Sequence, residues 1–258
     1  SIRNLQFTQA SFYQETPANL RMDVYLPSFT GGDPLPLRPF ILLIHGGGFQ
    51  IGSRQQFRDE CRRFARRGFV AATIDYRLEY DCATGPDAYN EAVYRAIQDA
   101  RAALRFAAFN ATNWKIDPNW FFIGGSSAGA GTALSVIYLT QAEANADFPA
   151  IVQNFGPLNG VGNPYTNTFT IRGVYNNWGG IVSSYVSAAE SVPMVAFHGD
   201  ADMTVNIDSE VKSTCPGSPS REVVGSRGLQ GILAGYGVCY DLTVKPGGGH
   251  IVYRSTSQ

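Results

Sequence analysis

Two uninterrupted apolar runs constrain the fold of this chain more than any other feature. They are Phe40 to Ile44 and Phe69 to Ile74, and neither alternates polar with apolar side chains. A strand with that pattern is covered on both faces, as in a parallel sheet that lies between two layers of helices. The sequence therefore predicts that both runs are central, parallel strands.

Helical patterns alternate with these and with further strand candidates. Residues 55–67 and 88–109 repeat apolar side chains at helical spacing. The remaining strand candidates are 6–13, 20–26, 120–123, 150–152, 192–197 and 240–244. Strand alternating with helix predicts an α/β fold, with a mostly parallel central sheet and helices on both faces.

The length and composition of the chain fit one domain of this class. It has 258 residues, and 44% of them are hydrophobic, which is enough to build a core on both faces of a sheet. The sequence has no internal repeat and no stretch with the composition of a linker, so we expect a single domain over residues 1–258. Residues 156–180, rich in glycine, asparagine and tyrosine, form the one long irregular segment, and we expect a small loop-rich lid or active-site loop there.

The charge balance narrows the class of partner. Lys and Arg number 20 and Asp and Glu number 21, so the net charge of -1 provides no field to hold nucleic acid or an anionic membrane. No apolar stretch reaches the ~18 residues that suggest a membrane span. No charged-then-apolar leader precedes Ser1, so we expect any signal peptide to have been removed. A neutral or modestly polar small molecule is the expected partner.

The four cysteines favour disulfides over a metal site. Cys61, Cys82, Cys215 and Cys239 form no C-x-x-C pair and have no nearby histidines, so we expect no zinc or other metal. Sequential pairing of Cys61 with Cys82 and of Cys215 with Cys239 closes the shortest loops, with four buried free thiols as the alternative. We expect Cys215 to be bonded to Cys239 under oxidising conditions. Together with a charged share of only 16%, this favours a secreted or periplasmic protein.

A serine between two glycines follows the candidate strand 120–123. Gly125-x-Ser127-x-Gly129 matches G-x-S-x-G, and a helical run starts at Ala130. In this motif a sharp strand-to-helix turn exposes the serine hydroxyl, and the helix N-terminus favours negative charge on a substrate. The alternative is a simple helix cap made by Ser126 or Ser127. The strand–turn–helix context favours Ser127 as a nucleophile, since Ser126 has no glycine two positions later.

A glycine loop follows the apolar run that ends at Ile44. His45-Gly46-Gly47-Gly48-Phe49 places three consecutive glycines where backbone N–H groups are open to a ligand. Such donors stabilise the oxyanion that forms when a hydroxyl attacks a carbonyl. Neither nucleotide-binding glycine motif occurs here, so we expect no nucleotide cofactor.

Three motifs together resemble the hormone-sensitive-lipase and carboxylesterase branch of the α/β-hydrolases. They are His45-Gly-Gly-Gly-Phe49, Asp75-Tyr-Arg-Leu78 and Gly125-Ser-Ser-Ala-Gly129, and the resemblance spans residues 40–250.

The resemblance implies an α/β-hydrolase fold that needs no cofactor. It also implies an oxyanion hole made by the N–H groups of Gly47, Gly48 and Ala128, with His45 in a structural role. The chain departs from the lipase pattern after Leu78, where Glu79-Tyr-Asp-Cys82 replaces the usual Ala-Pro-Glu. In this respect it is more similar to secreted bacterial carboxylesterases and feruloyl or acetylxylan esterases.

Only three histidines are candidates for the general base. The order of this fold is serine, then acid, then histidine, so His45 is excluded. His198 stands in a stretch that resembles the acid-bearing loop of the family, where it would orient the turn without transferring protons. His250 remains, after a glycine-rich loop that lets an imidazole reach back to Ser127, although it could also be a frayed residue near the terminus.

The acid is assigned by the same resemblance. Asp202 matches the aspartate of the family pattern His-Gly-x-x-Asp-x-x-Val, whereas Asp200 stands at a variable position and Asp208 lies further on. The Asp202 carboxylate would accept the Nδ1 proton of His250, fix its tautomer and stabilise the imidazolium.

These residues predict an esterase that works through an acyl-enzyme. The expected substrates are short-chain or aromatic esters, such as acetyl or feruloyl esters, on a small molecule or a polysaccharide. A catalytically silent α/β-hydrolase that serves as a binding module and a serine peptidase of the same fold remain alternatives. Specificity depends on loops that no motif describes, and we expect Phe49, Tyr165, Tyr175 and Trp178 to line the cleft, although each could equally be ordinary packing.

Overall fold

The computed structural model of the protein describes residues 1–15, 17–28 and 35–253 and is built around one large mixed sheet. Within these residues the sheet contains β1 (Ile2–Gln6), β2 (Arg21–Tyr25), β3 (Arg38–Ile44), β4 (Val70–Ile74), β5 (Ile116–Ser126), β6 (Ile171–Asn177), β8 (Met194–Gly199) and β11 (Tyr240–Lys245). A second, smaller sheet contains β7 (Ile181–Val182), β9 (Ser209–Lys212) and β10 (Arg221–Val224).

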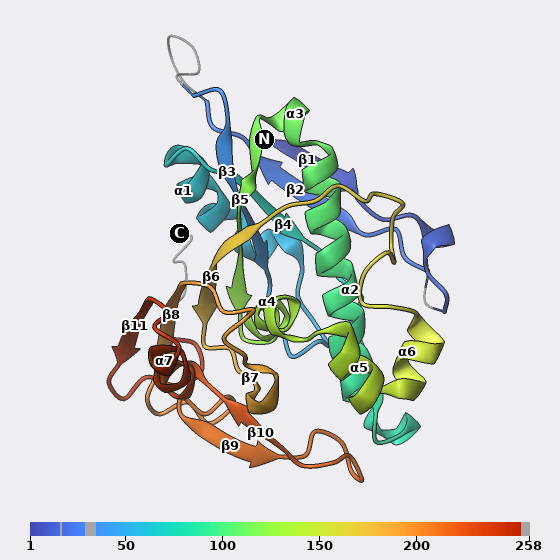
Figure 1. Ribbon diagram of the computed structural model, residues 1–258, viewed down its shortest axis with the longest axis vertical. Coiled ribbons are helices and arrows are strands. Elements are labelled where there is room, and N and C mark those ends of the chain that lie inside the picture. Colours follow the sequence, from blue (N-terminus) through green and yellow to red (C-terminus); the bar gives the residue numbers. More distant parts are fainter. Residues whose placement is uncertain (16, 29–34, 254–258) are drawn as a thin grey trace.

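Helices connect most of the strands (Figure 1). The α-helices are α1 (Arg58–Arg66), α2 (Ala88–Phe109), α3 (Ala111–Trp114), α4 (Ala128–Tyr138), α5 (Gln141–Asp147), α6 (Pro149–Phe155) and α7 (Ser226–Gly235). Short 3-10 helices are η1 (Ala10–Phe12), η2 (Arg54–Phe57), η3 (Cys82–Thr84) and η4 (Ser183–Tyr185).

The strand order of the large sheet is β1-β2-β4-β3-β5-β6-β8-β11. The first two strands are antiparallel to their neighbours, and all pairs from β4 to β11 are parallel. The prediction of an α/β fold with a mostly parallel central sheet is therefore confirmed.

Alternate side chains of β3 face opposite layers. Phe40, Leu42 and Ile44 belong to the core that includes α2 and α4, whereas Ile41 and Leu43 belong to a second core with residues of η2 and α1. A strand that is buried on both faces has no place for polar side chains, which accounts for the uninterrupted apolar run in the sequence.

Three sequence predictions are wrong at the level of secondary structure. Residues 6–13, expected as a strand, lie almost entirely beyond β1, which ends at Gln6, and they include the 3-10 helix η1. Residues 150–152, expected as a strand, lie inside α6, where Pro149 occupies the first turn of the helix. A short apolar run does not distinguish a strand from a buried helix segment.

The segment 156–180, expected as a lid or loop, contributes β6 to the middle of the large sheet. The strand lacks an apolar run because Gly173, Asn176 and Asn177 occupy part of it. A Cβ at position 173 would lie 3.2 Å from the ring of Phe122, so the absence of a side chain there fits the packing.

The second sheet lies beyond the large sheet, on the side toward which the arrow of β6 points (Figure 1). The loop between β9 and β10 is tied to η3 by a disulfide between Cys82 and Cys215, whose Cα atoms are 5.3 Å apart. The expected pairing of Cys215 with Cys239 and of Cys61 with Cys82 is wrong, because Cys239 is an exposed free thiol and Cys61 is a free thiol in the core. Short loop length was the wrong criterion, since the bond joins residues separated by 133 positions.

No helix in the described part of the chain is long and apolar enough to cross a membrane.

Candidate active site

Ser127 occupies the sharp turn between β5 and α4. Its backbone has φ 52° and ψ -121°, a region that non-glycine residues rarely adopt and that often marks a functional site. The Ser127 N–H donates to the carbonyl oxygen of Asn177 at the end of β6, 2.9 Å away. The turn is thus held by the neighbouring strand, and Ser127 lines a cavity near the carboxyl ends of β3 and β5.

The glycines of the motif are required by close backbone packing. A Cβ at Gly125 or Gly129 would lie 2.4 Å or 2.1 Å from the carbonyl oxygen of Ile44, which is far inside van der Waals contact. A Cβ at Gly46 would lie 2.9 Å from the carbonyl oxygen of Ser126. The turn and the glycine loop therefore approach each other at a distance that no side chain permits.

The structure brings together the serine, histidine and aspartate that the sequence selected. Ser127 Oγ lies 2.7 Å from His250 Nε2, and His250 Nδ1 lies 2.8 Å from Asp202 Oδ2. Because an ionised carboxylate only accepts, Nδ1 of His250 donates to it and Nε2 is free to accept the serine proton. Ser126, the alternative serine, is buried at the end of β5 and is not part of this array.

The Asp202 carboxylate is buried and fully hydrogen-bonded. Its Oδ1 accepts from the N–H groups of Thr204 and Val205, 2.8 and 3.0 Å away, and its Oδ2 accepts from both His250 and His198. Burial alone would raise the pKa of Asp202, but the hydrogen bonds from Val205, His250 and Thr204 hold it below its usual value. The carboxylate therefore stays charged at neutral pH.

His198 is a second histidine donor to this carboxylate. Its Nε2 lies 3.1 Å from Asp202 Oδ2 and 3.0 Å from the carbonyl oxygen of Val205, and its Nδ1 lies 2.8 Å from Ser226 Oγ. Both partners of Nε2 are acceptors, so Nε2 carries the proton. Burial lowers the pKa of His198, which keeps the ring neutral. His198 thus positions the carboxylate, as expected for a residue that orients the acid-bearing turn.

Hydrogen bonds join the loop of Asp202 to the loop of His250. The Ala201 N–H donates to the Gly248 carbonyl at 2.9 Å, and the Gly247 N–H donates to the Asp200 carboxylate at 2.6 Å. A Cβ at Gly199 would lie 2.1 Å from the Gly248 carbonyl oxygen. These contacts hold the loops of Asp202 and His250 together without a disulfide between Cys215 and Cys239.

His45 shapes the glycine loop and does not contact Ser127. Its Nδ1 lies 2.7 Å from the Gly46 carbonyl oxygen, and its ring stacks on Tyr76 with 4.4 Å between centroids. The Tyr76 hydroxyl donates to the His45 carbonyl. Burial lowers the pKa of His45, so the ring is neutral and Nδ1 can donate to the carbonyl.

The three residues expected to form an oxyanion hole lie in the glycine loop after β3 and at the start of α4, next to Ser127. Gly47 and Gly48 have φ values of 116° and 62°, which favour glycine. Gly48 and Ala128 line the same cavity as Ser127, whereas the Gly47 carbonyl closes the loop by accepting from Gln50 and Ile51. Ala128 is the first residue of α4, and a first-turn N–H has no partner within its own helix.

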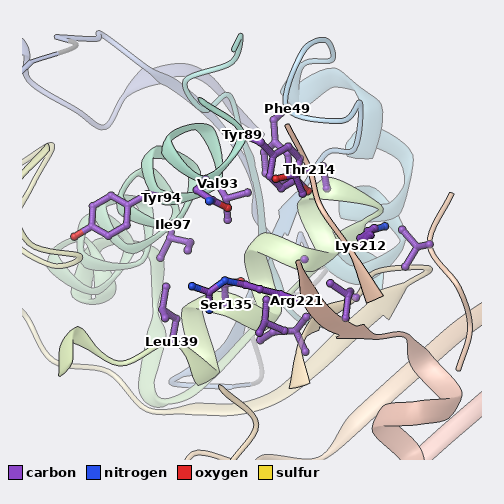
Figure 2. A pocket seen from close by; sticks show the side chains of 18 of the residues that line it. Phe49, Tyr89, Val93, Tyr94, Ile97, Ser135, Leu139, Lys212, Thr214 and Arg221 are labelled. Atoms are coloured by element: carbon purple, nitrogen blue, oxygen red, sulfur yellow. The ribbon is translucent and has the colours of Figure 1, made fainter. Parts of the chain in front are cut away.

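The cavity that contains Ser127 has a volume of about 400 Å³, in the usual range for a small-molecule site (Figure 2). Its walls come from the glycine loop, α2, α4 and the second sheet with the β9–β10 loop. Most of its lining side chains are apolar or aromatic. The polar ones include Asn90, Thr204, Lys212, Thr214 and Arg221.

Of the aromatic residues expected in the cleft, only Phe49 lines it. Tyr165 stacks on Phe109, with 4.2 Å between ring centroids, outside the cavity. Trp178 is buried, and its backbone N–H donates to the Phe197 carbonyl. Tyr175 belongs to β6 and packs against the Phe197 ring. The assignments of Tyr165, Tyr175 and Trp178 to the cleft are therefore wrong.

The aromatic lining comes instead from residues that the sequence analysis did not single out. Tyr80, Tyr89 and Tyr94 line the cavity from the α2 side, and Tyr185 lines it from η4, which follows β7. They carry no motif, and their role follows only from the packing of distant segments.

Within residues 1–15, 17–28 and 35–253, no group of three or more histidine, cysteine, aspartate or glutamate side chains is arranged to hold a metal ion.

Comparison with known proteins gives a family match over most of the chain. The family model described as BD-FAE matches residues 22–213. Gut esterase 1 of Caenorhabditis elegans is 30% identical over 153 residues, which are 55% of this chain and 27% of that protein. Isoprenylcysteine alpha-carbonyl methylesterase of Arabidopsis thaliana is 26% identical over 233 residues, 79% of this chain and 50% of that protein. The chain thus spans half or less of the length of these relatives.

Solved structures share the fold. Thermogutta terrifontis esterase 2, in a form phosphorylated by paraoxon, superposes with a TM-score of 0.64 at 20% sequence identity. The match covers 99% of this chain and 86% of that chain. The arrangement of strands and helices is therefore that of an α/β-hydrolase.

Proposed function

The chain belongs to the BD-FAE family and has the α/β-hydrolase fold, and from that premise we propose that it is a serine carboxylesterase. One observation carries the proposal. Ser127 Oγ lies 2.7 Å from the imidazole of His250, inside a cavity that Gly48 and Ala128 also line. A nucleophile, its base and backbone donors are then within reach of one substrate carbonyl.

The reaction would proceed in two halves. Ser127 Oγ attacks the ester carbonyl while His250 Nε2 takes its proton, and the tetrahedral intermediate collapses as His250 gives that proton to the leaving alcohol. Water then attacks the acyl-Ser127 ester, His250 takes a proton from it, and the acid departs as Ser127 Oγ recovers its proton. Asp202 stabilises the imidazolium in both halves through the bond to Nδ1.

The oxyanion of each intermediate would be stabilised by backbone donors. The N–H groups of Gly47, Gly48 and Ala128 are proposed for this role. The position of Gly48 and Ala128 beside Ser127 supports them, and the loop geometry of Gly47 is compatible with it. A donor of this kind contributes about 3 kcal/mol to transition-state stabilisation.

We further propose short-chain or aromatic acyl esters, including acetyl and feruloyl esters, as substrates. The alcohol part would be a small molecule or a polysaccharide. The apolar and aromatic lining of the cavity supports an uncharged acyl group.

A secreted or periplasmic location is proposed as well. The Cys82–Cys215 bond supports it, because disulfides persist in oxidising compartments and are rare in the cytosol.

A panel of acetyl, butyryl, octanoyl and feruloyl esters tests the activity. We expect the wild type to hydrolyse at least one of them, Ser127→Ala to lose turnover while remaining folded, and the matched variant Ser126→Ala to retain substantial activity. If Ser126→Ala were inactive and Ser127→Ala active, the nucleophile would be misassigned. Binding of esters without turnover by the wild type would favour a silent binding module instead.

A further inference from the structure

Ser226, the first residue of α7, is a fully buried serine that takes no direct part in the proposed reaction. Its exposed fraction is 0%, and its Oγ lies 2.8 Å from Nδ1 of His198. Because Nε2 of His198 carries the proton, Nδ1 is an acceptor and the Ser226 hydroxyl donates to it. The direction of this hydrogen bond is therefore fixed.

Hydrogen bonds lead without a gap from Ser226 to the nucleophile. Ser226 donates to His198 at 2.8 Å, and His198 donates to Asp202 at 3.1 Å. Asp202 accepts from His250 at 2.8 Å, and His250 lies 2.7 Å from Ser127 Oγ. These bonds together form the Ser226 relay. Its junction is Asp202 Oδ2, which accepts from both imidazoles.

The start of α7 is held in place by three neighbouring segments. The Arg227 N–H donates to the Ile207 carbonyl at 2.7 Å, in the segment that follows the acid-bearing loop. From β11, the Tyr240 hydroxyl donates to the Ser226 carbonyl at 2.7 Å. From β6, the Asn176 amide nitrogen lies 3.4 Å from Ser226 Oγ. The Ser226 oxygen thus faces a donor, and its hydrogen is oriented toward His198.

The relay affects how strongly Asp202 attracts the proton of His250. Donation by Ser226 polarises the His198 ring and makes its Nε2–H a better donor to Asp202, since hydrogen bonds in a chain strengthen one another. A carboxylate with a second good donor stabilises a neighbouring imidazolium less strongly. His250 must be neutral to take the Ser127 proton. The relay would therefore keep the base available at lower pH.

Other charged groups offer no equivalent effect in the part of the chain that the structure describes. On the elements around the two imidazoles, the charged side chains have other partners, and they are Asp208 with Arg227, Lys212 with Glu210, Asp200 with the Gly247 N–H, and Lys245 with the Val252 carbonyl. The neighbour from β6 is the neutral Asn176. Asp202 is thus the charged group through which His198 and His250 are linked.

We propose that Ser226 is a positioning residue of the esterase, which acts through His198 and Asp202 to keep His250 neutral and oriented as the base. The proposal deepens the proposed esterase function and rests on it. Ser226 contacts neither Ser127 nor His250 directly, so its whole effect must pass through the His198 ring.

The test is the pH dependence of kcat/KM in the wild type and in Ser226→Ala, with the ester of the acetyl, butyryl, octanoyl and feruloyl panel that the wild type hydrolyses fastest. In Ser226→Ala we expect kcat to fall about three- to tenfold and KM to change less than about twofold, because a positioning bond is lost. The acid limb of the profile should move to higher pH by about 0.3–0.5 unit. A serine that only stabilised the fold would lower the unfolding temperature and leave that limb in place, which would overturn the proposal.

Tyr240→Phe is the matched control, because it removes the bond to the Ser226 carbonyl and leaves the Ser226 hydroxyl. We expect a lower unfolding temperature and an acid limb within about 0.1 pH unit of the wild type. An equal shift of the limb in both variants would assign the effect to α7 as a whole and contradict a role for the hydroxyl.

His198→Gln tests the route of the effect. Glutamine retains an N–H donor but has no acceptor at the place of Nδ1, so Ser226 can no longer act through it. Adding Ser226→Ala to this variant should change kcat less than about 1.5-fold and leave the limb where it is. An equal fall in both backgrounds would show that Ser226 does not act through His198.

His198→Gln alone also provides the test if Ser226→Ala fails to fold. Its acid limb should lie about 0.3 pH unit or more above that of the wild type, since an amide is a weaker donor than the polarised imidazole. An unchanged limb would overturn the relay while leaving the esterase intact. A wild type that hydrolyses no ester, or full activity in Ser127→Ala, would instead contradict the proposed function itself.

Discussion

The floor and the cover of the cavity are built in different ways. The floor is the turn at Ser127 with the ends of β3 and β5, where backbones meet so closely that Gly125 and Gly129 cannot carry a Cβ. The cover is the second sheet with the β9–β10 loop, which the Cys82–Cys215 bond and the Arg221–Asp147 pair fasten to the rest of the molecule. The exposed fraction of Val211 in β9 is 71%, against 0% for Ile44 in β3. The nucleophile and the glycine loop thus belong to the closely packed floor, whereas much of the wall that surrounds a substrate belongs to the more exposed cover.

The largest effect is expected from a single methyl group in the floor. Gly129→Ala would place a Cβ 2.1 Å from the Ile44 carbonyl oxygen, and since that oxygen belongs to a central strand it cannot move away. We expect a loss of more than about 4 kcal/mol in the free energy of unfolding, as for severe overpacking. Urea denaturation measures it.

Gly231→Ala in α7 is the matched control, because no atom lies within 4 Å of the added Cβ. We expect it to stabilise the protein by about 0.5–1 kcal/mol through helix propensity. If Gly129→Ala were as stable as the wild type, the close backbone packing of the floor would not be needed for stability.

The next effect concerns the acid and its neighbour. In Asp202→Asn the Oδ1 bonds from Thr204 and Val205 can persist, but an amide nitrogen would face Nδ1 of His250 and favour the wrong tautomer. We expect kcat to fall about 10³-fold or more. Asp200→Asn should cost less than about tenfold, because an amide oxygen can still accept from the Gly247 N–H. Equal losses in the two variants would leave the acid unassigned.

A smaller effect is expected from releasing the cover. The replacement of both Cys82 and Cys215 by serine removes a link between residues 133 positions apart and should lower the free energy of unfolding by about 2–4 kcal/mol. Because the β9–β10 loop is a wall of the cavity, KM should rise more than kcat falls.

Cys239→Ser is the control for that pair, and its exposed thiol predicts a change within about 0.5 kcal/mol. Alkylation of unfolded, unreduced protein should modify two thiols, those of Cys61 and Cys239. Four modified thiols in protein made under oxidising conditions would show that Cys82 and Cys215 are not bonded to each other.

The same contrast explains what the sequence could predict. The floor was predictable because its backbone geometry demands particular residues: an apolar run for β3, glycines at 125 and 129, and a serine between them. Asp202 and His250 were found through the order of groups in the fold and a family resemblance, and the hydrogen bonds at 2.8 and 2.7 Å join them to Ser127 as expected.

The cover was not predictable, because it depends on contacts between segments far apart in the sequence. The Cys82–Cys215 bond, the pairing of β7 with β10 and the Arg221–Asp147 pair leave no local pattern. β6 was missed for a related reason, since a strand that contains Gly173 and two asparagines has no apolar period.

Covalent labelling identifies the nucleophile directly. Protein incubated with a fluorophosphonate, which forms a stable adduct with an activated serine hydroxyl, is digested and its peptides are analysed by mass spectrometry. We expect one adduct per chain, on Ser127, no adduct in Ser127→Ala, and an unchanged site in Ser126→Ala. An adduct on another residue, or ester turnover that persists in fully labelled protein, would contradict the claim that Ser127, activated by His250, is the nucleophile.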